Sequence, residues 1–136
     1  MAGTQRPYRR SYFMTDLKNT RVIIVEDDPF IAADIQDIIE EAGGSIVNVI
    51  PTLKEALQAA ETETVDLFTL DFEIISGTTE PVAKKLSERD IPFVAISGKS
   101  EKLKNMPEFH RSVIRSKPLN SVLLMDAIKV ARQRIN

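Results

Sequence analysis

Side chains able to do chemistry follow the hydrophobic stretches of this sequence: they are Glu26, Asp27, Asp71, Ser97 and Lys117. Two or three carboxylates, together with water, form the oxygen-rich kind of site that Mg²⁺ prefers. Carboxylates are ordinarily ionised at neutral pH, so a nucleophilic Asp71 would need no base to activate it for attack on phosphorus. Lys117 would supply a fixed positive charge, and Ser97 a hydroxyl hydrogen bond, to the phosphoryl oxygens. These residue types predict transfer of a phosphoryl group to Asp71 at a magnesium site.

Five short hydrophobic stretches must position these side chains, because each predicts a buried β-strand. The stretches are residues 22–25, 46–50, 65–70, 92–96 and 113–115. Helical patterns follow them at residues 29–42, 53–61, 80–89 and 100–105, and from 121 onward. This alternation predicts an α/β fold, a doubly wound five-stranded parallel sheet with helices on both faces. Ligands of such sheets bind beyond the carboxyl ends of the strands, so the polar side chains are expected at one edge.

The helices carry recognisable start signals. Asp28 followed by Pro29 predicts an N-cap with proline at the first helical position. Thr52 and Glu55 have the spacing of a capping box, in which each side chain bonds the other residue's backbone. Asn120 is expected to cap the last helix.

Each polar residue at the strand ends also has a purely structural interpretation. Asp28 is expected only to cap the helix that follows it. Asp71 can form a turn, Ser97 can belong to another turn, and Lys117 can be a solvated side chain before a helix. Helix capping explains the two acids before Asp28 less well. The joint placement of these residues at one edge favours the functional interpretation.

The composition excludes several classes of site. The 136 residues include no cysteine, which excludes disulfide scaffolds, thiol catalysis and cysteine-ligated metals. The one histidine, His110, lies in a polar stretch and is expected on a surface loop rather than as a phosphohistidine. No apolar run approaches the roughly 20 residues of a membrane span, and no secretory signal is recognisable. The expectation is a cytoplasmic protein with no membrane partner.

Charge is unevenly distributed along the chain. The net charge of −2 combines +3 over residues 1–20 with −5 over residues 21–136. The few arginines of the basic stretch show no recognition-helix pattern, so no nucleic-acid partner is predicted. The sequence therefore divides into a flexible basic tail over residues 1–20 and a single packed domain over residues 21–136.

The chain resembles the receiver domain of two-component response regulators, which have a flavodoxin-like (βα)5 fold. Four motifs carry the resemblance: RVIIVEDDP (21–29), DLFTLD (66–71), IPFVAISG (91–98) and SKP (116–118). The step of 26 residues from Asp71 to Ser97 is further similar to a subgroup of bacterial single-domain receivers.

The resemblance implies roles for individual residues. Asp71 would accept a phosphoryl group from a histidine kinase or a histidine phosphotransfer protein. Ser97 matches the hydroxyl whose movement reports phosphorylation, and Lys117 matches the phosphoryl-binding lysine. The metal ligands implied for Mg²⁺ are listed together: Glu26, Asp27, Asp71 and the main-chain carbonyl of Glu73.

The implied function is that of a stand-alone response regulator. Such a protein catalyses only its own phosphorylation and dephosphorylation, and it passes the signal on by binding a downstream protein. Two departures from the family pattern stand out. The run 72–77 replaces the usual loop after the phosphoacceptor and predicts a reshaped loop. Ile114 stands where an aromatic residue usually rotates on activation.

Two alternative functions and the oligomeric state stay open. Phosphatases of the haloacid-dehalogenase type use similar residues, but their usual second aspartate is replaced here by Glu73. A receiver-like interaction module that is never phosphorylated is the second alternative. The sequence also leaves open whether two copies form a homodimer through their last helices.

Overall fold

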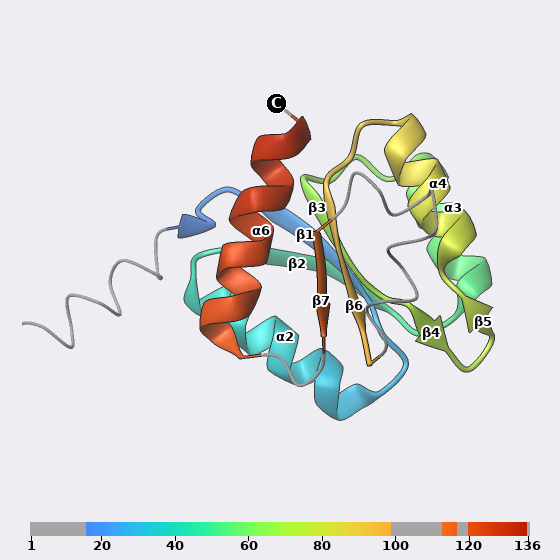
Figure 1. The fold of residues 1–136 in the computed structure, drawn as a ribbon, viewed down its shortest axis with the longest axis horizontal. Coiled ribbons are helices and arrows are strands. Elements are labelled where there is room, and N and C mark those ends of the chain that lie inside the picture. Colours follow the sequence, from blue (N-terminus) through green and yellow to red (C-terminus); the bar gives the residue numbers. More distant parts are fainter. Residues whose placement is uncertain (1–15, 99–112, 117–119, 136) are drawn as a thin grey trace, which may run out of the picture.

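A five-stranded parallel sheet forms the centre of the protein. The structure is a computed structural model and describes residues 16–98, 113–116 and 120–135 (Figure 1). The sheet has the strand order β2-β1-β3-β6-β7, and every neighbouring pair is parallel. The strands are β1 (Arg21–Val25), β2 (Ser45–Ile50), β3 (Leu67–Asp71), β6 (Phe93–Ser97) and β7 (Val113–Ser116).

Helices cover both faces of this sheet (Figure 1). On one face lie α2 (Pro29–Glu41) and α6 (Ser121–Ile135), and on the other lie α3 (Leu53–Thr62) and α4 (Glu80–Glu88). Alternate residues of a strand point to opposite faces, so each strand contributes to two cores. In β1, Val22 and Ile24 pack with α2 and α6, whereas Ile23 and Val25 pack with α3 and α4. The predicted α/β fold with a parallel sheet between two helical layers is confirmed.

The predicted start signals of three helices are confirmed by their hydrogen bonds. The side chain of Asp28 accepts hydrogen bonds from the amides of Phe30 and Ile31, at 2.9 and 3.3 Å. The Thr52 hydroxyl donates to the Glu55 carboxylate at 2.9 Å and accepts from the Glu55 amide at 3.4 Å. The side chain of Asn120 accepts from the amide of Leu123 at 2.9 Å. Local sequence therefore sets where these helices begin.

A small antiparallel hairpin follows β3, where the sequence predicted only a reshaped loop. Its strands are β4 (Glu73–Ile74) and β5 (Gly77–Thr78). Gly77 has φ +142°, a conformation that other residues rarely adopt, so this position favours glycine. The hairpin lies between the end of β3 and the start of α4, and it therefore flanks the carboxyl edge of the sheet (Figure 1).

The packed part of the chain already includes residues that precede Arg21. Leu17 is buried in the core beneath α2 and α6, and its amide donates to the carbonyl of Ala42 at 2.8 Å. Thr20 is buried too, and its hydroxyl accepts a hydrogen bond from Arg132 at 3.1 Å. The division at residue 20 stays a prediction as a whole, since residues 1–15 lie outside the described ranges.

Several expectations fall on residues that the structure does not describe. Lys117, His110 and the helix expected at residues 100–105 are among them. For Ile114, only the backbone in β7 is described. No helix within residues 16–98, 113–116 and 120–135 combines the length and apolar character that crossing a bilayer requires.

Candidate phosphoacceptor site

The register of the parallel strands brings the acidic residues of two strands together. Val25 of β1 pairs with Leu70 of β3, so the next residues along the chain, Glu26 and Asp71, lie side by side. Asp71 itself pairs with Ile96 of β6, one residue before Ser97. These residues therefore share the carboxyl edge of the sheet, as the sequence predicted for a doubly wound fold.

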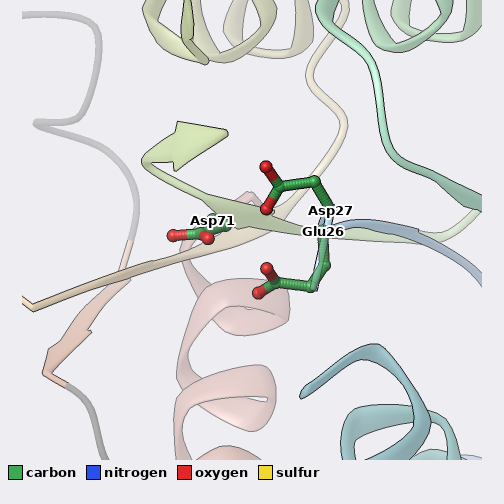
Figure 2. A group of neighbouring side chains, drawn as sticks. All are labelled: Glu26, Asp27 and Asp71. Carbon is green, nitrogen blue, oxygen red and sulfur yellow. The ribbon is translucent and has the colours of Figure 1, made fainter. Parts of the chain in front are cut away.

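Three carboxylates converge at this edge. Figure 2 shows Glu26 and Asp27 at the end of β1 and Asp71 at the end of β3, all extending toward the same side. One carboxylate oxygen of each lies within 4.8 Å of the others. Glu26 is 2% exposed, Asp71 is 5% exposed, and Asp27 is half-buried. Negative charges held this close repel one another, and a divalent cation with oxygen ligands would compensate them.

The donor set of this cluster fits Mg²⁺. Magnesium takes one or a few carboxylates and keeps several waters, and a half-buried Asp27 leaves the cluster open to solvent on one side. Asp28, the third acid of the motif, is not a member of the cluster, because its side chain caps α2. The structural interpretation of Asp28 was therefore correct.

Glu26 is fixed in place by its own backbone surroundings. Its amide donates to the carbonyl of Ile50 at 3.0 Å, which continues the β1–β2 pairing by one residue. One oxygen of its side chain accepts a hydrogen bond from the amide of Asp28 at 3.1 Å. The orientation of this buried carboxylate is thus set by the turn between β1 and α2.

Asp27 contacts the hairpin that follows β3. One oxygen of its carboxylate accepts a hydrogen bond from the amide of Ile75 at 2.5 Å. The next residue, Ser76, accepts a hydrogen bond at its hydroxyl from the amide of Leu53, the first residue of α3, at 2.9 Å. The tip of the hairpin therefore bridges the acidic cluster and the start of α3. Sequence reasoning did not find this bridge, because it joins residues that are far apart in the chain.

Ser97 ends β6 and is 4% exposed. It pairs with Ser116, the last residue of β7 and the residue before Lys117. The structure thus places Ser97 at the same edge as the acidic cluster. Lys117 lies beyond the part of the chain that the structure describes, so its place in the site stays a prediction.

Glu73 lies in β4, where it pairs with Thr78. Its side chain is exposed, so the carboxylate of Glu73 does not belong to the buried cluster. Its main-chain carbonyl as a further metal ligand stays a prediction from the family resemblance.

A buried threonine at the start of α4 was missed at the level of sequence. Thr79 is fully buried, and its hydroxyl donates to the carbonyl of Asp71 at 2.9 Å. In the sequence, a threonine just before Glu80 and Pro81 is typical of an ordinary helix N-cap. No local signal distinguishes that role from the contact that the structure reveals.

Comparison with known proteins agrees with this fold. The family model described as the response regulator receiver domain matches residues 22–129. The chain therefore belongs to the family of response regulator receiver domains, which are signalling modules rather than classical enzymes.

The chain is also similar to individual regulators. It is 28% identical over 86 residues to the phyllosphere-induced regulator PhyR of Methylorubrum extorquens, a match of 61% of this chain and 32% of PhyR. A solved structure of the PhyR stress response regulator has a TM-score of 0.71 at 27% identity, over 92% of this chain and 49% of that one. The chain thus spans about half or less of these PhyR proteins.

Two further solved structures extend the comparison, and the match covers nearly all of each. The solution structure of SdrG from Sphingomonas melonis is 31% identical with a TM-score of 0.71, over 82% of this chain and 95% of SdrG. The receiver domain of the sensor histidine kinase PA1611 from Pseudomonas aeruginosa has a TM-score of 0.71 at 14% identity, over 84% and 98%. That receiver holds a magnesium ion in its active-site cleft. At this low identity, the likeness to our chain concerns the fold alone.

Proposed function

We propose that this protein is a bacterial, cytoplasmic response regulator that accepts a phosphoryl group on Asp71. The observation that carries the proposal is the cluster of Glu26, Asp27 and Asp71, with ligand oxygens within 4.8 Å of one another at the carboxyl edge of a receiver fold. The donor is a phosphohistidine on a histidine kinase or a histidine phosphotransfer protein, as membership of the family implies.

The transfer itself needs little from the protein besides position and charge. An oxygen of Asp71 attacks the phosphorus of the phosphohistidine in line with the bond to nitrogen. The new oxygen–phosphorus bond forms as the phosphorus–nitrogen bond breaks, and the imidazole leaves with the bonding electrons and takes up a proton. The later attack of water on phosphorus returns the Asp71 carboxylate and releases inorganic phosphate.

The chain's own residues hold the reacting groups in this proposal. Glu26, Asp27, Asp71 and the main-chain carbonyl of Glu73 would hold Mg²⁺, which when bound neutralises charge on the phosphoryl oxygens. The hydroxyl of Ser97 donates a hydrogen bond to one phosphoryl oxygen, and the ammonium group of Lys117 pairs with another.

Phosphorylation would then shift the balance between two conformations of the domain. Since Ile114 stands where the family usually has an aromatic residue, we expect the shift to rely on Ser97, the loop after it, or the surface near the fourth helix. The changed surface binds a downstream protein, and neither nucleic acid nor a membrane is a partner in this proposal. Association of two copies through α6 is compatible with it.

The direct test is phosphorylation with a small donor. The full chain is incubated with acetyl phosphate and Mg²⁺, and its intact mass is followed with time. We expect the addition of one phosphoryl group, its loss when the metal is chelated, and no addition to Asp71→Asn. A wild-type mass that stays unchanged would contradict the proposal.

One observation favours a second candidate, a receiver-like module that binds a partner without being phosphorylated. The hairpin amide of Ile75 already occupies one oxygen of Asp27, an interaction that stabilises the site with no metal bound. The experiment above separates the two candidates, because a module that is never phosphorylated would gain no mass. Its Asp71→Asn variant would still bind the partner protein.

A further inference from the structure

Thr79 makes contacts that reach from the start of α4 back to the phosphoacceptor strand. Its side chain is fully buried. The hydroxyl donates to the carbonyl oxygen of Asp71 at 2.9 Å and lies 3.3 Å from that of Phe72. The amide of Thr79 donates to the carbonyl of Phe72 at 2.9 Å. One residue thus holds two consecutive carbonyl groups at the point where β3 ends.

The peptide group that joins Asp71 to Phe72 is consequently held at both of its polar atoms. Its carbonyl accepts from the Thr79 hydroxyl, and its amide donates to the carbonyl of Ile96 in β6 at 2.9 Å. A peptide group is planar, so fixing both atoms fixes the backbone direction on the carboxyl side of Asp71. The same contacts orient the chain that enters β4 at Glu73, whose carbonyl is the proposed backbone ligand for the metal.

Helix capping does not account for the hydroxyl of Thr79. Thr79 occupies the N-cap position of α4, where a threonine side chain ordinarily accepts a hydrogen bond from an amide of the first turn. It makes no such bond here. The hydroxyl instead donates to the carbonyl of Asp71. The start of α4 therefore lacks a side-chain cap, and the end of β3 has an additional hydrogen bond.

We propose that Thr79 is a positioning residue for phosphoryl transfer. Its hydroxyl holds the backbone of Asp71, and through Phe72 that of Glu73, in the orientation that the reaction and the metal require. This inference rests on the proposed function of the site. It assigns a role to a residue that touches neither the phosphoryl group nor the metal.

Three variants of the full chain test the proposal. Thr79→Val keeps the shape and removes the hydroxyl, whereas Thr79→Ser keeps the hydroxyl. Thr69→Val is the matched control: Thr69 is also buried in β3, but its hydroxyl has no hydrogen-bond partner in the described part of the chain. The readouts are the phosphorylation rate with acetyl phosphate, equilibrium Mg²⁺ binding by calorimetry, and folded content by circular dichroism at the assay temperature.

We expect Thr79→Val to lower the phosphorylation rate about tenfold and to weaken Mg²⁺ binding several-fold. Changes of this size correspond to the free energy of one lost buried hydrogen bond. Thr79→Ser and Thr69→Val are expected to stay within about twofold of wild type, since neither loses a positioning bond. If Thr79→Val does not fold, Thr79→Cys replaces it, because a thiol is a weak donor and should give an intermediate loss.

The outcomes distinguish the positioning role of Thr79 from the proposed phosphorylation of Asp71. A folded Thr79→Val that matches wild type in both rate and Mg²⁺ binding would overturn the positioning role and leave the proposed function intact. An equal loss in Thr69→Val would also overturn it, because the effect would then be general to β3. A wild-type chain that takes up no phosphoryl group would overturn the proposed function and this inference together.

Discussion

The amide of Ile75 donates a 2.5 Å hydrogen bond to the carboxylate of Asp27 across 48 positions of sequence. Ile75 lies at the tip of the β4–β5 hairpin, and its side chain is 94% exposed. Its backbone, and not its side chain, thus links the hairpin to the acidic cluster. Since Ser76 beside it accepts a hydrogen bond from the first residue of α3, two hydrogen bonds connect the carboxylate of Asp27 through the hairpin tip to α3.

Substitutions of Asp27 separate its charge from its role as a hydrogen-bond acceptor. Asp27→Asn and Asp27→Ala both remove the charge, but only asparagine keeps an oxygen for the Ile75 amide. Without Mg²⁺, we expect the free energy of unfolding of Asp27→Ala to lie about 1 kcal/mol below that of Asp27→Asn. Denaturant titration measures the difference, and equal stabilities of the two variants would contradict the role of this bond.

Added Mg²⁺ provides a second readout of the same pair. Wild type should become more stable as Mg²⁺ is raised, because the cation binds the folded state alone. Both variants should lose most of this gain, since each lacks one of the three carboxylates. A full gain in either variant would argue against Asp27 as a metal ligand.

Gly77 carries the backbone conformation that closes the hairpin. We expect Gly77→Ala to cost about 1–3 kcal/mol, because an alanine at a sparsely populated positive φ is strained. Its Cβ would also lie 3.3 Å from Cδ2 of Leu53, at the start of α3. Gly98→Ala is the control, since nothing lies within 4 Å of a Cβ there, and it should change stability by no more than about 0.5 kcal/mol. Similar losses in both variants would show that the hairpin conformation does not matter.

Leu17 tests where the packed domain begins. It is 2% exposed, so truncation in Leu17→Ala should lower the free energy of unfolding by about 2–5 kcal/mol. Val122→Ala, at a side chain that is 60% exposed in α6, should stay within about 0.5 kcal/mol of wild type. Chemical denaturation gives both values. A negligible effect of Leu17→Ala would support a domain that starts only at Arg21.

Much of the fold was predictable because its signals are local. The caps at Asp28, Thr52 and Asn120 each depend on one side chain that accepts a hydrogen bond from an amide two or three residues further along the chain. The buried strands were recognisable from continuous runs of apolar residues, since both faces of this sheet are covered. The first residue of β3 was less predictable: the apolar pattern begins at Val65, but pairing with β1 begins only at Leu67.

The hairpin was not predictable for a different reason. Its strands are two residues long, too short for any periodic pattern. What stabilises it is contact with Asp27 and Leu53, and neither residue is near it in sequence. The hydroxyl of Thr79 was not predictable either, because a threonine that caps α4 and one that bonds back to the end of β3 have the same sequence context.

By itself, the sequence determined the α/β fold and the residue types available at the carboxyl edge of the sheet. Apolar runs, caps and the order of elements depend on neighbours along the chain, so they can be recognised without coordinates. Only the tertiary structure decided that Glu26 lies beside Asp71, that Asp27 accepts a hydrogen bond from the amide of Ile75, and that Thr79 holds the end of β3. Those outcomes depend on strand register and on hydrogen bonds between distant segments, which exist only once the chain has packed.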